Sequence, residues 1–94
     1  MELSKEDYKN IITEIIKKQA IILGPQIAVL KARNVAGVSV TNEGVVTAIT
    51  GDQQVILQKL IDEYVSLSGE IVKNAVNSVF AKYPSLKRWN SEFK

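Results

Sequence analysis

A short block of alternating residues between two long helical patterns constrains the fold of this chain more than any other feature. Residues 38–41 alternate strictly between valine and a hydroxyl residue, and residues 45–50 are mostly β-branched. Asn42, Glu43 and Gly44 lie between them, with glycine where a hairpin turn needs a positive φ. The block therefore predicts one β-hairpin. Because a two-stranded hairpin is only marginally stable alone in water, we expect it to pack on the helices or to pair with a hairpin of another chain.

The segment before the hairpin has a helical pattern with one interruption. Ser4 is a good N-cap, and Asp7 completes a variant of the capping box. Gly24 and Pro25 interrupt the pattern, because proline has no N–H to donate and its ring crowds the preceding turn. We expect a kink or a short break here, with helix on both sides to about Asn34. The predicted apolar face, with one polar member, comprises Tyr8, Ile11, Ile12, Ile15, Ile16, Gln19, Ile22 and Leu23.

The most apolar stretch of the chain, residues 20–30, spans this interruption. Its 11 residues are too few for a membrane span, which needs about 20. We interpret the stretch as buried protein core. The polar, acidic start of the chain is unlike a signal peptide, so we expect a cytoplasmic protein.

A longer amphipathic pattern follows the hairpin. From Leu57 to Val79 the positions of one face, apolar except for Ser68, recur at spacings of 4, 3, 4, 4, 3 and 4 residues, which is typical of a nearly straight helix. No proline occurs between the hairpin and Pro84, so the pattern predicts one long helix over about residues 53–82, ~45 Å in length. Gly69 is the weak point if this helix bends. Its predicted oligomer or core face comprises Leu57, Leu60, Ile61, Tyr64, Leu67, Ile71, Val72, Ala75 and Val79.

These patterns predict a single α+β domain over residues 1–83, followed by a basic and aromatic tail over residues 84–94. The order is a kinked N-terminal helix, a two-stranded antiparallel β-hairpin and a long C-terminal helix (α-β-β-α). A chain of 94 residues buries only about 60–65% of its unfolded surface, which leaves a lone monomer marginal. The long helix also exceeds the dimensions of so small a domain. We therefore expect a homodimer, formed through the long helices, with pairing of the two hairpins as a further contact.

The charges are segregated along the chain. The formal net charge of +2 is the average of blocks of −2 (residues 1–14), +4 (15–42), −3 (43–81) and +3 (82–94). The simplest interpretation is that acids stand at helix starts and bases at helix ends, where they complement the helix dipole. Two other interpretations remain open, namely a basic contact patch for an anionic partner and antiparallel self-association of opposite blocks.

The composition excludes most catalytic and metal chemistry. The chain has no His and no Cys, so it has no imidazole base, thiolate nucleophile or thiolate zinc site. Asp62 and Glu63 are adjacent, but neighbours on a helix diverge by about 100° and cannot share one proton. No phosphate-binding glycine motif is present. We predict no enzyme activity, no catalytic residue, no metal ligand and no cofactor.

The tail carries the one cluster of residues whose composition is typical of a binding surface. Aromatic residues beside bases can lie on an anionic partner, although such a tail can also fold back onto the core. The candidate partner-binding residues are Lys87, Arg88, Trp89 and Phe93.

The leading functional hypothesis is a small non-enzymatic interaction module, with a scaffold or regulatory role, that self-associates and docks a protein partner. The first alternative is a nucleic-acid-associated protein that uses the basic segments 15–42 and 82–94. The second alternative is a carrier of an apolar ligand, with a pocket beside Gly24 and Pro25.

Overall fold

The computed structural model describes residues 4–83 of the chain. The helices and strands follow in the order α1 (Lys5–Leu23), α2 (Pro25–Arg33), β1 (Val38–Val40), β2 (Val46–Ile49), α3 (Gln53–Ser68) and α4 (Glu70–Phe80). This arrangement confirms the predicted α+β class and the antiparallel hairpin. The described residues form four helices, however, where the sequence pattern predicted two.

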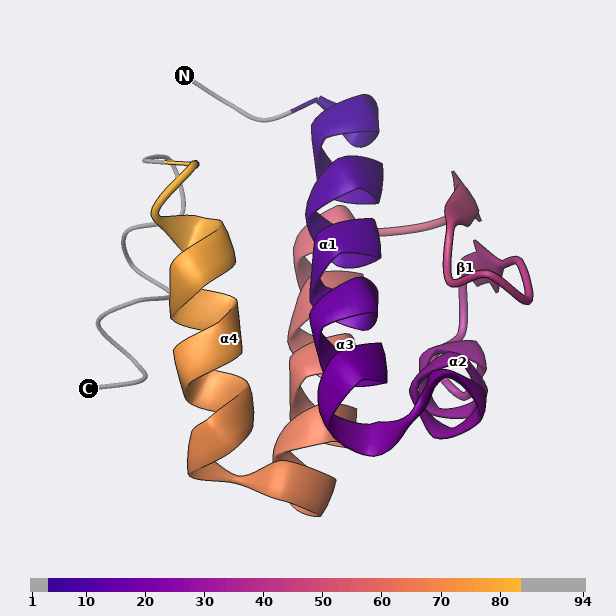
Figure 1. Ribbon diagram of the computed structural model, residues 1–94. Coiled ribbons are helices and arrows are strands. Elements are labelled where there is room, and N and C mark those ends of the chain that lie inside the picture. The colour runs from indigo at the N-terminus through magenta and orange to yellow at the C-terminus, as the bar shows by residue number, and fades with distance from the viewer. Residues whose placement is uncertain (1–3, 84–94) are drawn as a thin grey trace.

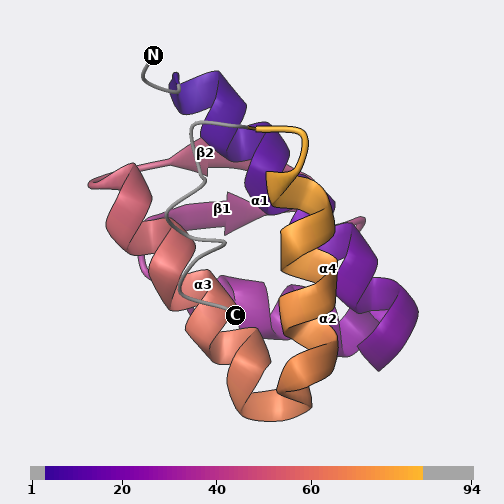
Figure 2. The ribbon, with the colours of Figure 1, turned by 90° about the vertical axis from the view of Figure 1, so that its left-hand side faces the viewer.

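The elements are arranged around a central pair of helices, α1 and α3 (Figure 1). Helix α4 packs against both of them on one side, and the hairpin and α2 lie on the other side. Figure 2 shows α4 running back alongside α3, while α2 crosses the direction of the other helices. The radius of gyration of the Cα atoms is 11.9 Å, close to the ~12 Å expected of a compact single chain of this length.

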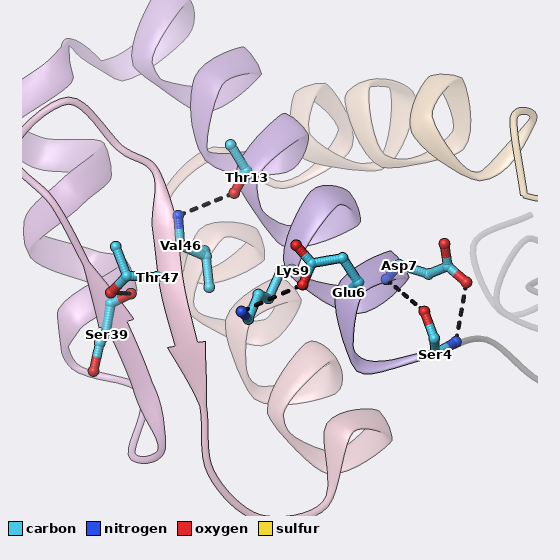
Figure 3. Close-up of polar contacts among 8 residues, drawn as sticks. All are labelled: Ser4, Glu6, Asp7, Lys9, Thr13, Ser39, Val46 and Thr47. Atoms are coloured by element: carbon cyan, nitrogen blue, oxygen red, sulfur yellow. Dashed lines mark hydrogen bonds and ion pairs between the residues drawn. The ribbon is translucent and has the colours of Figure 1, made fainter.

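Helix α1 begins as the sequence predicts. The backbone N–H of Asp7 donates to Ser4 Oγ over 3.1 Å, and the N–H of Ser4 donates to Asp7 Oδ2 over 3.0 Å (Figure 3). This capping box satisfies two N–H groups that have no partner within the helix. Its apolar stripe then faces the core, with Ile11, Ile12 and Ile15 completely buried.

Of the two arrangements expected at Gly24 and Pro25, a kink or a short break, the structure shows the break, so the predicted kinked N-terminal helix is two helices. Gly24 adopts φ 95° and ψ 146°, which is not a helical conformation, and ends α1. Pro25 then occupies the first turn of α2. An N–H at this position has no partner within the helix, so its absence from proline costs no hydrogen bond. The chain therefore turns sharply into a second helix rather than bending within one.

The prediction of one long C-terminal helix is wrong. Gly69, with φ 60° and ψ −120°, ends α3 and begins α4. Folding back at this glycine buries Val72, Val76 and Val79 of α4 against the central helices, where a straight helix would expose them. Because α4 folds back within one chain, the chain has no helix too long for a small monomer, which was one reason to expect a dimer. The homodimer stays a proposal.

The hairpin is fastened to the helices by side chains on α1 and α2. Its two strands pair Val38 with Ile49 and Val40 with Val46, with an irregularity between Ser39 and Val40. Val46 and Ile49 are buried, and the N–H of Val46 donates to Thr13 Oγ1 of α1 over 3.0 Å (Figure 3). The strands therefore rest on α1, as the marginal stability of a lone hairpin requires.

The hairpin turn depends on Gly44. Its φ of 84° is a conformation that other residues adopt at a cost, and an added Cβ would lie 3.1 Å from Ile16 Cγ2 of α1. A glycine is therefore needed here both for the turn and for the close approach of the hairpin to the helix.

Replacement of Thr13 by valine should loosen the hairpin. Valine keeps the shape of threonine but cannot accept the Val46 N–H, so we expect Thr13→Val to lower the free energy of unfolding by about 1–2 kcal/mol. Urea unfolding followed by circular dichroism measures it. Thr47→Val is the matched control. The Thr47 hydroxyl donates to the Ser39 carbonyl over 3.3 Å, but this bond is exposed and water can replace it, so the change should stay within about 0.5 kcal/mol. Equal losses in both variants would refute a specific role for Thr13.

Candidate functional site

Four exposed aliphatic side chains lie around the break between α1 and α2. Ile21 and Ile22 in the last turn of α1 are 86% and 41% exposed, and Ile27 and Leu30 on α2 are 44% and 55% exposed. We call these four residues the apolar corner. The other exposed large hydrophobic residues of the described chain are spread over the hairpin and α3; they are Val45, Val55 and Leu67. Single exposed apolar residues are normal on protein surfaces, whereas a group of them around one turn is typical of an interaction site.

The backbone at Gly24 explains why these side chains are exposed. The N–H of Gly24 donates to the carbonyl of Ala20 over 3.0 Å and closes α1, and its carbonyl accepts from the N–H of Ala28 over 3.1 Å and opens α2. The helix axis therefore changes direction within one residue. After the turn, α2 presents Ala28, Val29 and Ala32 to the core, while Ile27 and Leu30 face outward. The interpretation of residues 20–30 as buried core is thus wrong for the apolar corner.

Lysine residues flank the apolar corner. Lys17 and Lys18 precede Ile21 and Ile22 by four residues on α1, and residues four apart lie on the same side of a helix. Lys31 stands one turn beyond Ile27 on α2. Because residues 15–42 contain no Asp or Glu, no acid of this segment offsets these charges. The corner therefore combines exposed aliphatic surface with a positive rim.

Arg33, the fourth base of this segment, has a different role. Its guanidinium donates to the carbonyl of Val40 over 3.1 and 3.3 Å, and to Asn42 Oδ1 over 2.8 Å. These bonds tie the end of α2 to the hairpin. Arg33 therefore fixes the orientation of α2, and its donors are directed at the hairpin rather than at the corner.

Tyr64 holds α2 from the inside of the molecule. Its hydroxyl donates to the carbonyl of Ala28 over 2.6 Å, and the whole side chain is buried. Burial raises the pKa of the Tyr64 phenol, since the charged phenolate would lose its hydration there. This bond joins α3 to α2 and so positions the helix that carries half of the apolar corner.

Gln19 lies two residues before the corner and is the one polar side chain in the core of the described residues. It is completely buried, and neither its amide nitrogen nor its amide oxygen has a hydrogen-bond partner. An unpaired buried polar group costs about 1–3 kcal/mol. The last turns of α1 therefore contribute less to stability than the apolar turns before them.

The predicted face of the C-terminal region is divided by the turn at Gly69. Leu67 is 45% exposed, Ala75 is half-buried, and the side chain of Ile71 is not among those that the structure describes. The completely buried members of this face are Leu57, Leu60, Ile61, Tyr64, Val72 and Val79. They pack within one chain against the neighbouring helices, so the structure places them in the core of the monomer.

The candidate tail residues Lys87, Arg88, Trp89 and Phe93 lie outside the described residues, and their role stays a prediction.

The apolar corner was missed by reading the sequence, although one signal pointed to it. Ile21 does not belong to the apolar stripe of the first helix, so a helical arrangement of residues 20–30 cannot bury it together with Ile22 and Leu23. The continuous run of apolar residues concealed this misfit.

Within residues 4–83, no group of three or more His, Cys, Asp or Glu residues is arranged to hold a metal ion. No helix of that part of the chain has the length and apolar character needed to cross a membrane. Comparison of the chain with protein-family models, with curated proteins and with solved structures gives no match.

Removal of the Tyr64 hydroxyl should weaken the attachment of α2. Tyr64→Phe keeps the packing but deletes the bond to Ala28, so we expect the free energy of unfolding at pH 7 to fall by about 1 kcal/mol. Urea unfolding measures this loss.

The same variant should also change the response to alkaline pH. A tyrosine whose folded pKa lies above the unfolded value of about 10 stabilises the protein fully below pH 10, and this contribution is lost as the pH rises toward the folded pKa. The stability of the wild type should therefore decline more steeply above pH 10 than that of Tyr64→Phe. Tyr83→Phe is the control and should keep the steep decline, because Tyr64 is still present. Parallel curves for the wild type and Tyr64→Phe would contradict the assignment.

Proposed function

We propose that this protein is a small non-enzymatic interaction module that self-associates and docks a protein partner. The observation that supports the docking role is the apolar corner, where Ile21 is 86% exposed beside three further exposed aliphatic residues. Covering these side chains would release the free energy of removing apolar surface from water, about 25 cal/mol per Å².

The chemistry around the corner favours an acidic, amphipathic helix as the docking element of the partner. Lys17, Lys18 and Lys31 each stand one helical turn from a residue of the apolar corner, and complementary charges speed association and exclude positively charged competitors. An amphipathic helix supplies apolar residues at the spacing needed to contact two adjoining helices. Isoleucine and leucine offer no flat ring on which a base could stack, so the corner favours a protein partner over nucleic acid.

A synthetic helical peptide tests this chemistry. The probe has about 18 residues, with leucine along one face and glutamate along the other. Titration of the labelled peptide, followed by fluorescence anisotropy, should show saturable binding that weakens as salt is added. Ile21→Ser and Leu30→Ser should each weaken the affinity about tenfold or more, because each removes an aliphatic contact worth about 1.5–3 kcal/mol when buried.

The control for this test is Val55→Ser. Val55 is 48% exposed on α3, comparable to Leu30, but it does not belong to the apolar corner. It should therefore leave the affinity unchanged. Equal losses in all three variants, or no binding of the peptide to the wild type, would refute the corner as a docking site. A peptide with glutamine in place of glutamate should bind more weakly if the lysine rim contributes.

Self-association has a separate test. Multi-angle light scattering should give the mass of a dimer, twice 10.4 kDa, at micromolar concentration. A monomer mass over the whole accessible concentration range would contradict this part of the proposal and leave the docking test unaffected.

A further inference from the structure

The two helix breaks of this protein are built differently. When the sequence is aligned on Gly24 and Gly69, the buried residues of the two preceding helices fall at equivalent positions. Ile12, Ile15 and Ile16 of α1 correspond to Leu57, Leu60 and Ile61 of α3. The residue after Gly24 is Pro25, which cannot continue a helix from α1 into α2. The residue after Gly69 is Glu70, which can.

The break at Gly69 therefore rests on one glycine. Its φ of 60° and ψ of −120° form a combination that residues with a Cβ rarely adopt. An added Cβ would meet no atom within 4 Å, so the site is restricted by backbone conformation and not by space. Helix α4 begins without a side-chain cap, and in a continuous helix its first N–H groups would bond to the last carbonyls of α3.

The packing of α4 against the central helices keeps this break in place. Val76, Val79 and Phe80 are buried there, and Lys82 Nζ lies 2.8 Å from Glu14 Oε1 of α1. The hydrogen bond to Glu14 raises the pKa of the Lys82 ammonium. Glu14 Oε2 on α1 and Asn77 Oδ1 on α4 are buried without hydrogen-bond partners, which reduces what the association of the two helices contributes.

We propose that two copies of this chain dimerise by exchanging α4 about Gly69. In the dimer α3 and α4 form one continuous helix, and each α4 packs on α1 and α3 of the partner. A helix over residues 53–80 is about 42 Å long, whereas the longest extent of the monomer is 33 Å. In a straight helix, α4 would therefore project beyond its own chain, and a second copy is needed to cover its apolar face. Exchange restores the packing of α4 on α1 and α3, now between two chains. It also releases Gly69 of each chain from its unusual backbone conformation, which makes exchange a low-cost route to a dimer.

The proposal also explains why the helical spacing of the sequence keeps its register across Gly69, from Leu57 to Val79, with Ser68 as its one polar position. It deepens the proposed self-association and rests on it.

The first test compares two alanine variants at matched glycines. Gly69→Ala penalises the folded-back conformation and favours the straight helix, so the dimerisation constant should rise about tenfold or more. Gly24→Ala is the control, because Gly24 is also a positive-φ glycine in open space but Pro25 prevents a continuous helix. It should lower stability without raising the dimerisation constant. Light scattering over a concentration series measures both.

The second test uses the absence of cysteine from the chain. Glu14→Cys and Lys82→Cys chains are mixed in urea, refolded together and treated with a short bis-maleimide linker. In an exchanged dimer the Glu14 position of one chain lies beside the Lys82 position of the other, so a link between residues 14 and 82 of different chains should appear in the dimer fraction. The double variant on a single chain is the control and should link internally when monomeric.

The outcomes separate the two proposals. A link between residues 14 and 82 of different chains, increased by Gly69→Ala, supports exchange. A dimer that gives no such link, although the double variant links internally, overturns exchange and leaves self-association standing. A monomer at every concentration, for the wild type and for Gly69→Ala, overturns both.

Discussion

The layer of side chains between α1 and α3, aliphatic except for Tyr64, supports every other element of the structure. These side chains are completely buried, and each aliphatic one contributes about 1.5–3 kcal/mol relative to an exposed position. The hairpin, α2 and α4 are all too short to be stable alone in water, so each depends on packing against this layer. The residues of the layer are Ile11, Ile12, Ile15 and Ile16 on α1, and Leu57, Leu60, Ile61 and Tyr64 on α3.

Both helix breaks follow from the limited area of this layer. A single pair of helices cannot cover all the apolar surface in the chain, so the chain turns back at Gly24 and Gly69 to add α2 and α4. The turn at Gly69 allows α4 to bury Val72, Val76, Val79 and Phe80. The turn at Gly24 succeeds in part, because α2 buries Ala28 and Val29 but leaves Ile27 and Leu30 in water. The docking proposal uses the apolar surface that stays exposed at the turn at Gly24.

The two proposals use different parts of the molecule and different physical terms. Docking depends on exposed aliphatic surface with a lysine rim, which is present in the folded monomer. Exchange of α4 depends on a backbone conformation that the monomer tolerates only because the residue is glycine. In the exchanged dimer the partner's α4 packs on α1, and Gly24 and Pro25 keep their conformation. The apolar corner could therefore serve as a docking site in the monomer and in the dimer.

Local chemistry was sufficient to predict the capping box at Ser4, the hairpin with its glycine turn and the interruption at Gly24 and Pro25, because each depends on residues that are neighbours in the chain. The buried stripes of α1 and α3 were equally predictable, since helical spacing places them on one face. Local chemistry did not predict the end of α3, the crossing of α2 or the exposure of Ile21. A periodic pattern continues unchanged across Gly69 whether the helix is straight or folded back, and the choice depends on whether α1 of the same chain can cover α4. That coverage is a contact between residues far apart in the sequence, so it has no local signature.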